Sequence, residues 1–189
     1  MSSNNSVLKK NLRLGCKGNS VLPDFVNMVN MTHPNPAKGT MLLYYNIKKL
    51  KKGWWDMNGK WVIEGLVEYY GHGWVSWGVS ETGHMDNGVA VVGFTDDPEN
   101  LKKYHMFGPD ETFTPDNMVP AADGVIDGHV EKTADTTLLY FTKYLEQGED
   151  WPINKDGMNY FIMAGGDGND LAYHPVRKHF DVDLTRACF

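Results

Sequence analysis

Histidine, methionine and cysteine are the side chains of this sequence that could bind a metal, and there are seven, ten and two of them. None belongs to a Cys-x-x-Cys-His or His-Glu-x-x-His motif. The sequence also lacks the Gly-x-Ser-x-Gly of serine hydrolases and the glycine loop that binds phosphate. We therefore expect no catalysis by this chain itself.

Most of the histidines and methionines carry no local signal of a function. His72 lies between two glycines, which is typical of an exposed turn, and His33, His105 and His129 belong to no motif. A single methionine in a β-rich core usually packs against its neighbours. Residue type alone therefore singles out no pair of metal ligands.

Two loops carry oxygen ligands of the kind that calcium prefers. Asp123 precedes a glycine, and residues 167–170 read Asp-Gly-Asn-Asp. Their spacing does not match the EF-hand, and the same residue types are common in ordinary turns. Cation binding and plain turn formation are both open.

Tryptophans offer another kind of site, because large exposed aromatic rings often mark binding surfaces. The rings that could stack on a sugar are those of Trp54, Trp55, Trp61 and Trp151. Inward packing of at least one ring of the adjacent pair is the alternative.

Charge and composition limit the class of partner and the location. A formal net charge of -6 argues against nucleic acid and anionic membranes. No segment approaches the roughly 20 apolar residues of a membrane-spanning helix. Residues 1–10 lack the apolar stretch of a signal peptide, so the chain is either cytosolic or begins after signal removal. Cys16 and Cys188 lie near opposite ends, and both a disulfide between them and two free thiols are open.

Short apolar runs separated by turn residues begin at Thr40 and predict an all-β fold. We expect a flexible lead-in over residues 1–18 and a single domain over residues 19–189, an immunoglobulin-like antiparallel β-sandwich with little helix. The expected strands are residues 41–48, 61–70, 74–79, 89–94, 128–133, 136–144, 160–164 and 180–184. The expected turns and loops are residues 54–60, 71–73, 96–100, 108–120, 146–156 and 165–170.

Three groups of motifs, in this order, resemble the DOMON family. In the first, residues 73–80 (GWVSWGVS) and 83–94 (GHMDNGVAVVGF) resemble a tryptophan strand, a glycine turn with a methionine, and a strand of small and apolar residues. In the second, residues 138–145 (LLYFTKYL) are similar to an L-x-F-x-R-x-L strand. The third resembles the closing strands of the family and comprises residues 160–166 (YFIMAGG), 171–175 (LAYHP) and 182–184 (VDL).

The resemblance spans roughly residues 40–185, and the order and gaps of the motifs fit better than any single one of them. The sequence departs from the family at three places. Asn87-Gly88 stands where many members have Ala-Asp, Lys143 replaces the usual Arg, and residues 162–164 lack a Trp. These departures leave the subfamily open.

The resemblance implies an extracytoplasmic electron-transfer domain, similar to the cytochrome domain of cellobiose dehydrogenase. Residue by residue, its two axial haem ligands correspond to Met85 and His174. Without Cys-x-x-Cys-His, haem b would be bound non-covalently. A Met/His pair raises the reduction potential relative to two histidines. Because it also leaves no open position for oxygen, it suits single-electron transfer with a redox partner protein.

The same resemblance implies residues around the haem. The expected apolar contacts of the ring are Trp74, Trp77, Val91, Phe94 and Tyr173. Arg177, with Lys178 beside it, is expected near the propionates.

Two alternatives accompany this reading. His84 could replace Met85 as a ligand, although adjacent residues of an extended chain face opposite sides; His179 is a weaker candidate for the other ligand. The second alternative is a haem-free DOMON module that binds carbohydrate or a cation as a recognition domain.

Overall fold

The computed structural model describes residues 25, 27–32, 39–50, 59–106, 118–120, 127–148, 150–171, 174 and 176–187. Several residues singled out above lie outside these ranges: Cys16, His33, Trp54, Trp55, Asp123, Tyr173 and Cys188. Within the described ranges, the structure contains no helix long and apolar enough to cross a membrane.

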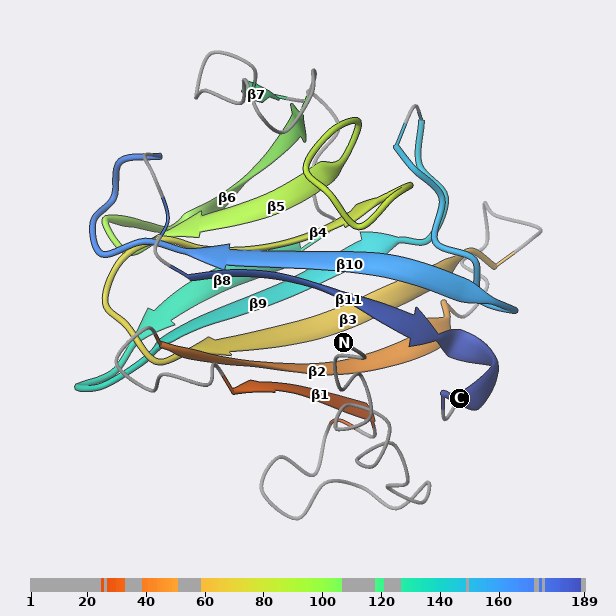
Figure 1. Ribbon diagram of the computed structural model, residues 1–189, viewed down its shortest axis with the longest axis horizontal. Coiled ribbons are helices and arrows are strands. Elements are labelled where there is room, and N and C mark those ends of the chain that lie inside the picture. Colours follow the sequence, from red (N-terminus) through yellow and green to blue (C-terminus); the bar gives the residue numbers. More distant parts are fainter. Residues whose placement is uncertain are drawn as a thin grey trace, which may run out of the picture.

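The described residues form two antiparallel sheets that pack face to face as a β-sandwich, as predicted (Figure 1). One sheet has the strand order β1-β2-β3-β9-β8 and the other β11-β10-β4-β5-β6-β7. The strands are β1 (Asn27–Thr32), β2 (Thr40–Lys49), β3 (Trp61–Tyr69), β4 (Val75–Ser80), β5 (Val89–Phe94), β6 (Asp97–Met106), β7 (Met118–Pro120), β8 (Asp127–Lys132), β9 (Thr137–Tyr144), β10 (Met158–Gly165) and β11 (Val176–Asp183). A short 3-10 helix, η4 (Leu184–Arg186), follows β11.

The main hydrophobic core lies between the two sheets, and Trp77 of β4 is fully buried in it. Its ring stacks on Phe141 of the opposite sheet, with centroids 4.5 Å apart, and meets Phe161 of β10 edge-on at 5.1 Å. Room for the Phe141 ring comes from Gly65, where a Cβ atom would lie 2.2 Å from Phe141 Cζ. Aromatic packing thus joins the sheets at their centre.

Strands β4 and β5 are buried along their whole length. Successive side chains of a strand point to opposite faces of its sheet. On β5, Val91 therefore lies in the main core, whereas Ala90 and Val92 belong to a separate cluster. The six-stranded sheet consequently buries apolar side chains on both of its faces.

Residues 96–100, predicted as a loop, mostly belong to β6, and this prediction was wrong. Pro98 and its acidic neighbours suggested a loop, but residues 97–103 lie at a sheet edge. There β6 pairs with β5 on one side, while the described part of β7 pairs only with residues 104–106. An edge position tolerates proline because the outward N–H groups need no partner strand. Charged side chains are also common on edge strands.

Three further strands differ from the prediction. Residues 118–120 were expected in a loop and form β7. Strand β11 begins at Val176 rather than at residue 180. Strand β1 was not predicted, since its sequence NMVNMT has little alternation.

Candidate functional site

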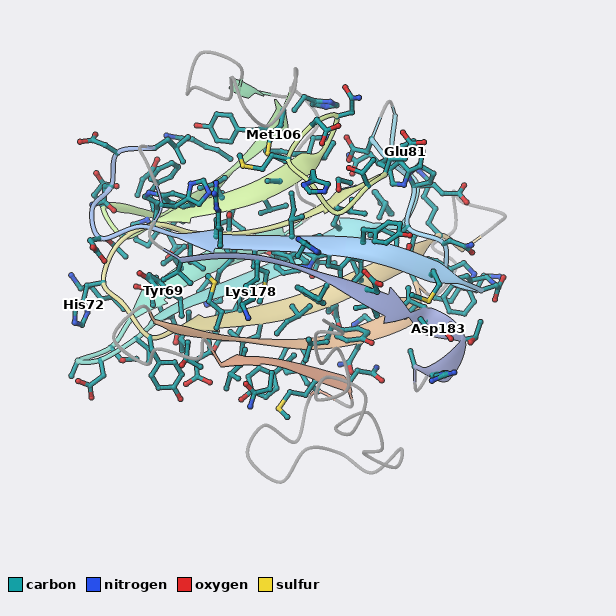
Figure 2. All side chains as sticks on the ribbon, in the orientation of Figure 1. Tyr69, His72, Glu81, Met106, Lys178 and Asp183 are labelled. Carbon is teal, nitrogen blue, oxygen red and sulfur yellow. The ribbon has the colours of Figure 1, made fainter. Side chains whose placement is uncertain are left out.

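A second hydrophobic cluster, called the outer cluster below, lies on the face of the six-stranded sheet that points away from the main core. Its buried members are Trp74, Ala90, Val92, Phe94, Met106 and Ile162, and Met85, Tyr104, Ala164 and Leu171 pack against them. Figure 2 labels Met106 at the end of β6, near the top of the view. Burial in these surroundings raises the pKa of Tyr104.

Met85 reaches the outer cluster from the β4–β5 loop, residues 81–88. The Gly88 N–H donates to the Met85 carbonyl at 3.0 Å, and Asn87 between them has a φ of 54°. The Met106 N–H in turn donates to the Gly88 carbonyl at 2.9 Å. A Cβ atom on Gly88 would lie 2.7 Å from Met106 Cε and 3.0 Å from the Met85 oxygen, so glycine allows the close packing of this turn. The hydrogen bond from Met106 therefore ties the end of the loop that carries Met85 to β6.

His174 reaches the outer cluster from the β10–β11 segment. Its ring lies edge-on to that of Trp74, with centroids 5.8 Å apart and an interplanar angle of 77°. His174 is half-buried, and its Nε2 atom is buried. Trp74 is a buried member of the outer cluster, so His174 and Met85 border the same apolar surface.

The Trp74 backbone is itself tied to the segment that leads to His174. The Trp74 N–H donates to the Gly168 carbonyl at 2.9 Å, and the Gly166 N–H donates to the Trp74 carbonyl at 3.1 Å. A Cβ atom on Gly73 would lie 1.9 Å from the Gly166 oxygen, which leaves no space for a side chain. This close approach holds the start of β4 beside the β10–β11 segment.

Met85 and His174 are the two residues that the DOMON resemblance implies as haem ligands, and they come from two different loops onto one cluster. The sequence matches no family model, and no curated protein matches it. The ligand assignment therefore stays a prediction.

The structure divides the residues expected around a haem ring. Trp74 and Phe94 belong to the outer cluster, against which Met85 packs, and His174 contacts Trp74. Trp77 and Val91 lie in the main core on the opposite face of the sheet. Successive side chains of a strand point to opposite faces of the sheet. Trp77 lies three residues from Trp74, and Val91 lies three residues from Phe94, so each member of a pair points to the face opposite the other. Arg177 is exposed on β11, opposite Ala164.

One cation near the outer cluster was missed by sequence reasoning. The Lys102 ammonium lies 5.0 Å from the centroid of the Phe94 ring, in cation–π contact. It also lies 3.9 Å from an Asp97 carboxylate oxygen. The sequence analysis placed residues 96–100 in a loop and assigned no element to residues 101–106, so the strand that carries Lys102 was not predicted.

The acidic loop of residues 167–170 serves internal contacts. The Asn169 Oδ1 atom accepts hydrogen bonds from the Thr95 N–H at 3.1 Å and from the Thr95 hydroxyl at 2.8 Å. Asp167 hydrogen-bonds Tyr69 and helps burial, the larger cause, to raise the pKa of Tyr69 to about 12. Among the described residues there is no group of three or more His, Cys, Asp or Glu that could hold a metal ion. The described contacts favour the turn interpretation of this loop.

The remaining histidines lie in different surroundings. The rings of His84 and His179 are neighbours, with centroids 5.7 Å apart. His129 stacks on Tyr140 at 4.6 Å. His72 is exposed, as expected for a turn.

Proposed function

We propose that this chain is a DOMON-like b-type cytochrome domain that transfers single electrons between a redox partner and an acceptor outside the cytoplasm. Met85 and His174 would be the axial ligands of a non-covalent haem b. The observation that supports this proposal is that a thioether and an imidazole, carried by separate loops, border one buried apolar cluster.

The donor set and its surroundings fit this group chemically. An imidazole nitrogen and a thioether sulfur are an established pair of axial ligands for haem iron. Haem iron would supply the one-electron redox chemistry. The Trp74 ring packs at 77° to the His174 ring and would restrict the orientation of that ring. The buried side chains of Val92, Phe94 and Ile162 would exclude water, which is how a protein tunes a redox site through its outer contacts.

Charged side chains at the edge of the outer cluster would meet the acidic groups of the haem. Lys102 lies over Phe94, and exposed Arg177 lies opposite Ala164 in the register. Both retain access to water, so each could neutralise a carboxylate without being buried as a lone charge.

The test is an absorption spectrum of the full chain after addition of haemin, removal of the excess and reduction. The wild-type protein should show the Soret and α bands of a ferrous b-type cytochrome. His174→Ala should abolish this spectrum, and Met85→Ala should remove the bands of the six-coordinate low-spin state.

Two variants control for the loss of a histidine or a methionine elsewhere. His179→Ala removes an exposed histidine, and Met158→Ala removes a methionine that is 50% exposed. Both should keep the wild-type spectrum. A wild-type chain that takes up no haem, or a His174→Ala variant with the full spectrum, would overturn the proposal.

One observation favours the second candidate, a haem-free module that binds carbohydrate. Trp151 is 38% exposed and could stack on a sugar ring. Trp61 is instead half-buried against the main core, with the Lys155 ammonium 5.6 Å from its ring centroid. A chain that stays colourless with haemin, binds glycans and loses that binding in Trp151→Ala would support this candidate.

A further inference from the structure

Two exposed histidines meet at the edge of the six-stranded sheet. His84 belongs to the loop of residues 81–88, which begins at the Glu81 label in Figure 2, and His179 belongs to β11. Their ring centroids are 5.7 Å apart, with an interplanar angle of 43°. Residues far apart in the sequence therefore present two imidazoles to solvent at one place.

The backbone around both histidines explains why the rings meet. Gly83 has a φ of +81°, and a Cβ atom there would lie 3.5 Å from His179 Cδ2 and 3.6 Å from Tyr160 Cδ1. The His179 ring thus packs over the backbone of Gly83, and His84 is the next residue. The Gly83 N–H donates to the Ser80 hydroxyl at 2.8 Å, which anchors the loop to the end of β4.

The other histidine is held by the sheet itself. His179 lies opposite Ile162 in the antiparallel pairing of β10 with β11. Ile162 is a buried member of the outer cluster, so the backbone below His179 belongs to a packed part of the molecule. Little reorganisation of the main chain is needed to keep the two rings together.

Two neighbouring imidazoles are a chelating pair for a divalent transition metal. Neutral imidazole is the commonest metal ligand in proteins and suits zinc, copper and nickel. With metal–nitrogen bonds of about 2.0–2.1 Å, two imidazoles on one tetrahedral ion have centroids roughly 5 Å apart. The observed 5.7 Å is close enough for small side-chain rotations to supply the difference.

We propose that His84 and His179 form a surface site for a divalent transition-metal ion such as Zn²⁺, with water completing the coordination. The described residues provide no third His, Cys, Asp or Glu to this group. The ion would therefore be held by two protein side chains. Its remaining positions would be accessible to water or to a further ligand from outside.

Occupancy of this site would also act on the loop that carries Met85. His84 directly precedes Met85, so an ion shared with His179 ties the loop of residues 81–88 to β11. Only the consequence for the haem rests on the proposed function, which assigns Met85 as a ligand. Metal binding and the tether of the loop to β11 do not depend on haem.

The metal site is tested by calorimetric titration of the tag-free, haem-free full chain with ZnCl₂ and, separately, NiCl₂. We expect binding that weakens at least tenfold in His84→Ala and to the same extent in His179→Ala. His129→Ala is the matched control, because His129 is also accessible and stacks on an aromatic ring, and it should bind like the wild type. Equal affinity of His84→Ala, His179→Ala and the wild type would overturn the site.

The effect on the loop is tested by amide hydrogen exchange of residues 81–88 with and without Zn²⁺. Exchange should slow in the wild type and stay unchanged in His179→Ala. Unchanged exchange in a wild-type chain saturated with Zn²⁺ would refute the tether. Both experiments use haem-free protein, so failure of the haem proposal leaves their outcome readable.

Discussion

Lys143 and Asp150 form a buried ion pair in which Nζ lies 2.6 Å from Oδ2 and each side chain is 1% exposed. Lys103 Nζ lies 2.9 Å from the other carboxylate oxygen, and His105 Nε2 lies 3.4 Å from it. Lys103 belongs to β6 of one sheet and Lys143 to β9 of the other. One carboxylate after β9 therefore binds cations from both sheets.

Asp150→Asn should lower the free energy of unfolding by about 3–5 kcal/mol, because two buried ammonium groups lose the carboxylate that they share. Urea denaturation measures the change. The matched control is Asp156→Asn, which removes a carboxylate that is 72% exposed and pairs with Lys155 at the surface. Its effect should stay within about 1 kcal/mol, and similar small losses in both variants would contradict the structural role of Asp150.

Gly73→Ala should destabilise the chain by roughly 3 kcal/mol, since its Cβ would lie 1.9 Å from the Gly166 oxygen and 2.5 Å from the Gly168 oxygen. Relief of this overlap separates Trp74 from the segment that leads to His174, so retention of added haem should fall as well. Gly168→Ala is the control, because its Cβ would meet no atom within 4 Å. Thermal denaturation of both variants checks the prediction, and a Gly73→Ala protein as stable as Gly168→Ala would refute it.

Ionisation of the buried Tyr45 hydroxyl should make the chain less stable at high pH. Burial, with a smaller contribution from Asp183, raises the pKa of Tyr45 to about 12, against an ordinary value of 10.0. Unfolding therefore releases a proton between these two pH values, and stability is unaffected by this group below about pH 10. From pH 10 towards 12 the free energy of unfolding should fall by up to roughly 2–3 kcal/mol on account of Tyr45.

The comparison variant for this pH dependence is Tyr45→Phe, which has no hydroxyl to titrate. Its free energy of unfolding in urea should decline less steeply than that of the wild type above pH 10. Parallel slopes for the two proteins would show that the Tyr45 hydroxyl does not cause the alkaline loss.

Met85→His should lower the reduction potential of the haem-loaded chain, because an imidazole in place of a thioether stabilises the ferric state. A spectroelectrochemical titration measures this shift. Met158→His places the same residue at an exposed methionine position and should leave the potential unchanged. A potential in Met85→His equal to that of the wild type would remove Met85 from the ligand set.

The sequence by itself determined which segments form most of the strands and which residues alternate along them. Residues 89–94 were predicted as a strand and form β5, and the predicted pairing of residues 128–133 with 136–144 is found as β8 with β9. These features depend on local properties, namely the two-residue period of apolar side chains and the turn residues between runs. A sandwich follows from many such strands with little helix.

Tertiary structure alone decided which residues share a surface. Trp74 and Trp77 look equivalent in the sequence, yet they lie on opposite faces of one sheet. Lys143 looked like a variant of a motif position, and only the fold shows Asp150 beside it. Residues 97–100 favour a loop by their own chemistry, yet they begin β6, which pairs with β5. The physical reason is common to these cases: pairing, burial and charge neutralisation depend on distant segments, which no local pattern specifies.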